Sequence, residues 1–60
     1  MNTLIEVKEK VDKGITVYWK TLNYKVVRKG VFDYYLKSSN GALTYLSNNF
    51  NPSDFFIKNN

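Results

Sequence analysis

The cations, the tyrosines and one carboxylate near the end of this 60-residue chain are the residues whose chemistry points to a ligand. The charge favours anionic partners without choosing among nucleotides, nucleic acid and acidic protein surfaces. If the partner is a nucleotide, it requires positive charge for its phosphate, a flat ring for its base, and a hydroxyl or carboxylate for its ribose. This chain can meet these needs only by combining Lys20, Arg28 or Lys37 with Tyr18 or Tyr45 and with Asp54. We expect them to form the ligand site, and we expect more than one subunit to contribute them, because one small chain offers too little concavity.

Most of these residues, and Trp19, also have a structural interpretation. Tyr18 is out of phase with its apolar neighbours, and its ring suits an oligomer interface as well as base stacking. The lysines and Arg28 are typical of a solvated face, although a guanidinium pairs bidentately with phosphate. Asp54 is suited to orienting the last strand through loop amides. Trp19 is in phase with the core, whereas at a sheet edge its indole would stack a base.

Several kinds of chemistry are excluded by what the chain lacks. It contains no His and no Cys, and its five Asp and Glu residues are scattered rather than paired at a recognisable spacing. Its three glycines stand apart, so no glycine-rich phosphate loop is formed. We therefore expect a binding protein rather than an enzyme, with no metal and no cofactor.

Composition limits the size of the fold and the kind of partner. Hydrophobic residues make up 43% of the chain and aromatic residues 17%, which predicts a folded protein. A net charge of +4 favours anionic partners. Sixty residues form one domain, residues 1–60, with a marginal core that neither disulfides nor metal can reinforce. We therefore expect a symmetric homo-oligomer, a dimer or larger.

Neither a membrane span nor a leader is indicated. No apolar run approaches the length of a span, and residues 1–10 carry two Glu and no apolar stretch of signal-peptide type. We expect a cytoplasmic protein, in the bacterial host cytoplasm if it is viral.

The N-terminal segment has the pattern of a helix. Thr3 followed by Glu6 has the spacing of a capping box, and apolar residues recur at Leu4, Val7 and Val11. Gly14 is the natural left-handed residue at its C-terminal end. At about three turns, such a helix needs a surface to lie on.

The rest of the chain alternates with period two, which predicts strands. We expect strands over residues 15–20, 24–29, 31–38 and 42–46, with a short fifth over 54–57. Residues 21–23 are predicted as a turn. Asn40 and Gly41 are expected to take the two positive-φ positions of a type I′ hairpin turn.

The predicted fold is therefore α+β, with the N-terminal helix packed on a small antiparallel sheet of four to five strands. One helix covers one face, which leaves Tyr18, Tyr35 or Tyr45 and several cations on the second face. The predicted core consists of Leu4, Val7, Val11, Ile15, Val17, Trp19, Val26, Phe32, Leu36, Leu46 and Phe55.

Four segments resemble a known family of viral proteins. They are residues 11–14 (VDKG), 16–19 (TVYW), 34–41 (YYLKSSNG) and 52–57 (PSDFFI). Their order over nearly the whole chain resembles the small, β-rich sponge proteins that act against the Thoeris bacterial defence. The chain lacks the insertion that longer members carry between the second and third strands, so no individual binding residue is carried over.

The resemblance implies a phage anti-defence protein that binds a small anionic nucleotide, a bacterial immune signal, and sequesters it without cleavage. Two alternatives remain open. In a small basic nucleic-acid-binding module, exposed tyrosines would stack bases while Lys and Arg bind phosphates. In an inhibitor of a host protein, the open sheet edge or the aromatic face would bind that protein directly.

Overall fold

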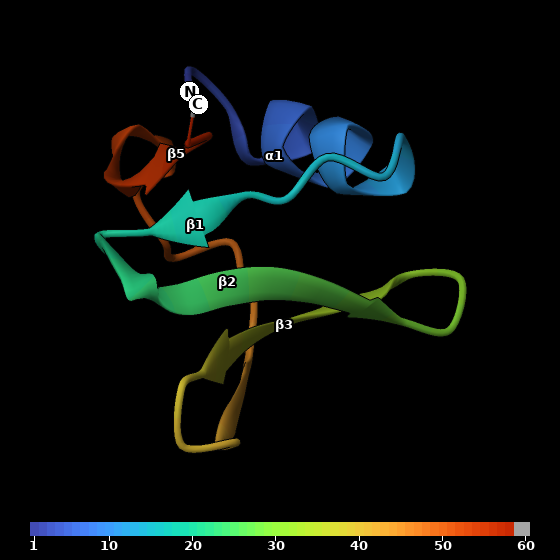
Figure 1. Ribbon diagram of the computed structural model, residues 1–60. Helices are drawn as coiled ribbons and strands as arrows, with labels where there is room; N and C mark the ends of the chain where they lie inside the picture. Colours follow the sequence, from blue (N-terminus) through green and yellow to red (C-terminus); the bar gives the residue numbers. More distant parts are fainter. Residues whose placement is uncertain (59–60) are drawn as a thin grey trace.

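A short N-terminal helix lies against a five-stranded antiparallel sheet (Figure 1). The computed structural model describes residues 1–58. Its elements are α1 (Leu4–Asp12), β1 (Tyr18–Trp19), β2 (Thr21–Lys29), β3 (Asp33–Ser38), β4 (Leu43–Tyr45), a 3₁₀ turn η1 (Pro52–Asp54) and β5 (Phe55–Phe56). The strand order is β4-β3-β2-β1-β5, so the last strand joins the sheet beside the first. The predicted α+β fold is confirmed.

Both ends of α1 are fixed as the sequence predicts. The Thr3 hydroxyl accepts from the Glu6 N–H at 3.1 Å, and the Glu6 carboxylate accepts from the Asn2 N–H at 2.9 Å. At the other end, Gly14 has a φ of 84° and its N–H donates to the Val11 carbonyl at 3.0 Å. A glycine adopts this left-handed conformation without steric cost, so the chain can leave the helix there and start toward β1. Among residues 1–58, no helix is long and apolar enough to cross a membrane.

The turn between the first two strands is tighter than predicted. Trp19 pairs with Thr21, so Lys20 alone makes the turn, with a φ of 60°. Its N–H donates to the Asp54 carbonyl at 2.8 Å, which holds the turn in place. The prediction of a turn over residues 21–23 is therefore wrong, because pairing with β1 extends β2 back to Thr21, with a shift of register between Tyr18 and Trp19.

The turn between β3 and β4 is also of a different type from the one predicted. Gly41 has a φ of 91°, but Asn40 does not have a positive φ, so the predicted type I′ turn is wrong. The Ser38 carbonyl accepts from the Gly41 N–H at 3.0 Å, and the Ser38 N–H donates to the Ala42 carbonyl at 2.9 Å. This is the three-residue loop in which a type I turn precedes a left-handed glycine. The Asn40 side chain supports it by accepting from the Ala42 N–H at 3.1 Å.

The core lies between α1 and the sheet. Its buried side chains are Val7, Val17, Val26, Tyr34, Leu36, Leu46 and Phe55. Six of these seven were predicted, and Leu4, Val11, Ile15 and Trp19 are half-buried. Phe32 is 82% exposed, so its assignment to the core is wrong. The β2–β3 ladder ends at Lys29 opposite Asp33, which leaves Phe32 in the connecting loop and gives its place in the core to Tyr34.

The opposite side of the sheet carries a different set of side chains. Residues paired across antiparallel strands point to the same face, and residues adjacent in a strand point to opposite faces. The face away from Val26 and Leu36 therefore carries Tyr18, Lys25, Val27, Lys29, Asp33, Tyr35, Lys37, Leu43, Tyr45 and Phe56. We call this set the open face. The predicted placement of three tyrosines and several cations on this second face is confirmed.

Candidate functional site

A shallow depression lies on the open face, across β1, β2 and the end of β3. Its volume is about 320 Å³, and it is lined by Tyr18, Leu22, Asn23, Lys25, Lys37, Ser38 and Ser39. The lining therefore combines two cations, one phenol ring, an amide and two hydroxyls.

The sheet register brings the main groups of this depression together. Tyr18 pairs with Lys25, and Lys25 pairs with Lys37, so the three residues form one row over three adjacent strands. Neighbouring strands lie about 4.8 Å apart, which keeps the row within the span of one nucleotide. Phe56 extends the row on β5, with its ring stacked on that of Tyr18 at a centroid distance of 5.6 Å and an interplanar angle of 28°. This stacking fixes the Tyr18 ring beside the lysines.

The two lysines face each other without a compensating acid. Lys25 and Lys37 are both exposed, and the ion pair found within residues 1–58 joins Arg28 to Asp12 instead. Like charges directly opposite in a sheet destabilise it, because their side-chain roots are only about 5 Å apart. An anion bound between the two ammonium groups would remove this repulsion.

The chemistry available here is electrostatic attraction, hydrogen bonding and ring stacking. The lysines offer donors to an anion, and the Tyr18 ring offers an apolar surface next to them. No group of His, Cys, Asp and Glu residues within 1–58 could hold a metal ion. Two of the six predicted site residues, Tyr18 and Lys37, are brought together in this depression.

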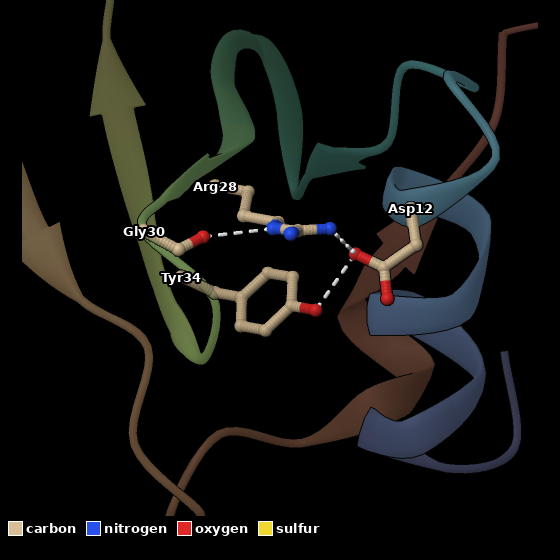
Figure 2. A network of polar contacts seen from close by, with 4 residues as sticks. All are labelled: Asp12, Arg28, Gly30 and Tyr34. Carbon is tan, nitrogen blue, oxygen red and sulfur yellow. Dashed lines mark hydrogen bonds and ion pairs between the residues drawn. The ribbon is translucent and has the colours of Figure 1, made fainter.

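Arg28 lies elsewhere, in a polar network between α1 and the β2–β3 turn (Figure 2). Its position on β2 points it to the α1 side of the sheet, opposite to Lys25. Its Nε donates to the Gly30 carbonyl at 2.8 Å, and its Nη1 lies 3.1 Å from Asp12 Oδ1. Within one chain, Arg28 therefore lies apart from Lys37 and Tyr18, because its guanidinium links the helix to the hairpin. Its place in a site shared between subunits stays a prediction.

The same network shifts two proton equilibria. The Tyr34 hydroxyl donates to Asp12 Oδ1 at 2.7 Å. This hydrogen bond and the nearby Arg28 guanidinium lower the pKa of Asp12. The same hydrogen bond raises the pKa of Tyr34. The network thereby fastens the C-terminal turn of α1 to the sheet.

Lys20 and Asp54 lie beside a second depression, of about 310 Å³, near the β1–β2 turn. Its lining is Trp19, Asn49, Phe50, Asn51 and Asp54. The Lys20 ammonium lies over the Trp19 ring, 4.8 Å from its centroid. Lys20 and Asp54 are thus near each other, and they do not line the depression of Tyr18 and Lys37.

Trp19 packs edge-on against Tyr24 and Phe50, at centroid distances of 5.3 and 5.7 Å. Its Nε1 is buried, with no hydrogen-bond partner in the described part of the chain. These contacts support the core interpretation of Trp19 over an exposed stacking platform.

Tyr45 lies on the edge strand β4, where it is 54% exposed. It pairs with Tyr35, and the two rings meet edge-to-face at 5.5 Å. Tyr45 shares the open face with Tyr18 but does not line the depression. The six predicted residues therefore divide among four places.

The predicted site omits Lys25 and Asn23, which line the depression with Tyr18 and Lys37. Lys25 was one of the basic residues with a possible phosphate role, whereas Asn23 was assigned only to a turn. Lys25, Val27 and Lys29 are two residues apart, so the sequence indicates that they share one face of the strand. The position of Lys25 opposite Lys37 depends on the β2–β3 register, which the lengths of the turns determine.

Comparisons with protein-family models, with curated proteins and with solved structures find no match.

Proposed function

We propose that the protein is a non-catalytic nucleotide-binding protein whose ligand occupies the depression on the open face. The observation that carries this proposal is the uncompensated pair of Lys25 and Lys37, directly opposite each other beside the Tyr18 ring. A sheet that keeps two like charges at this spacing gains stability when an anion binds between them.

The groups of the depression match the parts of a nucleotide. The phosphate binds to the Lys25 and Lys37 ammonium groups, and the base stacks on Tyr18. Asn23 and Ser39 lie at the rim, where an amide and a hydroxyl can hydrogen-bond ribose or a base edge. The volume of about 320 Å³ is near the lower end of ligand pockets, which suits one nucleotide unit.

The ligand proposed first is a free nucleotide signal of bacterial immunity, bound and sequestered without cleavage. The resemblance to sponge proteins motivates this choice. Binding without cleavage agrees with a lining of lysine, tyrosine, amide and hydroxyl groups, which lacks a paired carboxylate or imidazole base.

A second candidate is a single-stranded nucleic acid. The observation that favours it is the continuation of the open face beyond the lysines, where Tyr35 and Tyr45 meet edge-to-face. Basic grooves lined with aromatic rings bind single strands with little sequence preference.

One binding panel separates these ligands. Cyclic dinucleotides, cyclic trinucleotides, ADP-ribose derivatives and short oligonucleotides are added to the protein, and the melting temperature is followed. A ligand at 100 times its Kd stabilises the fold by about 2.7 kcal/mol. If the ligand is a free signal, one of the small nucleotides raises the melting temperature of the protein and is recovered chemically unchanged after heat release. If the protein is a nucleic-acid-binding module, only the oligonucleotides raise the melting temperature.

Matched lysine variants locate the site. Lys25→Ala and Lys37→Ala are each expected to weaken binding at least tenfold, because each removes one charged hydrogen-bond donor from the phosphate. Lys29→Ala is the control, since Lys29 is four residues along β2 from Lys25, about 13 Å at roughly 3.3 Å per residue. Equal binding by Lys25→Ala and by the unaltered protein would overturn the proposal, as would a panel without any stabilising ligand.

A further inference from the structure

The outer edge of β4 is protected only by the shortness of the strand, which has three residues. Edge strands are commonly blocked by charged residues, by proline or by a bulge. Residues 42–46 carry no charge and no proline, and β4 pairs with β3 in regular register. Leu43 is 43% exposed and Tyr45 is 54% exposed. This edge is therefore open to another strand.

The other edge of the sheet is covered. The Lys20 N–H donates to the Asp54 carbonyl, so the next carbonyl, that of Phe55, faces away from β1. The N-terminal ammonium of Met1 donates to this carbonyl at 3.4 Å. The two edges thus differ, and strand addition is directed to β4.

The free hydrogen-bonding groups of β4 follow from its ladder with β3. The Ser38 N–H donates to the Ala42 carbonyl, and the Leu46 N–H donates to the Tyr34 carbonyl. Backbone groups alternate along an antiparallel strand, so those of Leu43 and Tyr45 point outward. Thr44 lies between them and is exposed.

We propose that β4 of a second copy of this chain pairs antiparallel with β4. The two copies are related by a two-fold axis that passes between their Thr44 residues. Antiparallel pairing in this register places Leu43 of each copy opposite Tyr45 of the other. Each Leu43–Tyr45 pair then exchanges two backbone hydrogen bonds, and a leucine packs against a tyrosine on the open face. The occupant is a second copy because the segment is uncharged and complementary to itself, and because the core of the described residues is small and gains from a continuous sheet.

This dimer would enlarge the candidate site, a consequence that rests on the proposed function. The row of Lys25, Lys37 and Leu43 crosses three strands of one copy. Across the two-fold it continues with Tyr45 and Tyr35 of the second copy, which meet edge-to-face. The lysines of each copy would thus share a continuous surface with the tyrosines of the other. Two such rows, related by symmetry, suit a ligand with two phosphates and two bases.

A charge swap at Thr44 tests both the dimer and its register. The two Thr44 residues would face each other with Cα atoms about 4.5 Å apart, as in a non-hydrogen-bonded pair. Thr44→Lys and Thr44→Glu alone place like charges there and are expected to abolish the dimer. A mixture of the two variants is expected to restore it as a heterodimer. Thr16→Lys and Thr16→Glu are the controls, because Thr16 is exposed and lies outside the sheet.

The readout is the mass in solution, without any nucleotide, at protein concentrations up to about 1 mM. The unaltered protein and the Thr16 variants are expected to approach twice the 7.0 kDa of one chain. Circular dichroism checks that the Thr44 variants remain folded. A mass of one chain for the unaltered protein overturns the dimer. A dimer of Thr44→Lys alone, or a mixture of the two Thr44 variants that stays monomeric, overturns this register. Because no ligand is present, none of these results depends on the nucleotide site, which the lysine variants test separately.

Discussion

Replacing Lys37 by glutamate should stabilise the fold and weaken ligand binding at the same time. Lys37 lies directly opposite Lys25 on the open face, and both side chains are exposed. Lys37→Glu converts a repulsive cross-strand pair into an attractive one. The same change removes one of the two cations proposed to hold the phosphate.

The size of the stability change follows from the exposure of the two lysines. The charges lie at the ends of flexible, exposed side chains, and an exposed cross-strand charge pair contributes about 0.2–1 kcal/mol. Reversing one charge removes a repulsion and adds an attraction, so we expect a change in the free energy of unfolding of about 1 kcal/mol at physiological salt. For a domain of this length, that corresponds to a rise in melting temperature of about 4–8 °C.

Lys29 supplies a control of opposite sign on the same strand. It lies opposite Asp33, so Lys29→Glu replaces an attractive pair by a repulsive one. Both substitutions change the net charge equally, which separates the local pair from the overall charge. We expect thermal unfolding to show Lys37→Glu above the unaltered protein and Lys29→Glu below it. The difference should shrink in about 1 M salt, where the screening length is about 3 Å.

Two results would refute this reasoning. If Lys37→Glu and Lys29→Glu shifted the melting temperature in the same direction, the cross-strand pairs would not control the effect. If Lys37→Glu bound the nucleotide found in the panel as tightly as before, the two lysines would not form the phosphate site.

Three further predictions concern the core, the helix end and the polar network. Leu36→Ala should lower the free energy of unfolding by about 2–5 kcal/mol, whereas Phe32→Ala should change it by less than about 0.5 kcal/mol, as measured by urea titration. Gly14→Ala should cost about 1 kcal/mol, because alanine is strained at a φ of 84°, and equal melting points would contradict this. Asp12 has a lowered pKa in the folded state, so its contribution to stability is present above pH about 4 and is lost as the pH falls further. Asp12→Asn should therefore flatten the pH dependence of stability in that acidic range, and an unchanged slope would show that the hydrogen bond from Tyr34 does not act there.

Local signals in the sequence were sufficient where a few neighbouring residues control the conformation. The capping residues Thr3 and Glu6 and the left-handed Gly14 define α1, because their hydrogen bonds lie within one helical turn. Alternation along β3 also placed Leu36 in the core. Period two is a property of a single strand, so it requires no partner to be read.

Residues at the strand ends were predicted less well. Alternation placed Phe32 in phase with Leu36, but the hairpin loop takes Phe32 out of the sheet. The Asn40–Gly41 pair indicated a hairpin correctly, whereas the exact turn depends on side-chain contacts between Asn40, Ser38 and Ala42. Several turn types accept the same two residues, and the flanking strands select among them.

The candidate site was decided by pairings between distant segments. Tyr18 and Lys37 were identified from residue type and phase, yet only the register shows that Lys25 lies between them. Arg28 was an equally good phosphate partner by residue type, and its contact with Asp12, sixteen residues earlier, assigns it to the helix instead. A sequence determines which side chains share a face of one strand, because that depends on a two-residue period. Which strands lie next to each other, and in what register, follows from turn length and core packing over the whole chain, so only the tertiary structure brings the two lysines together.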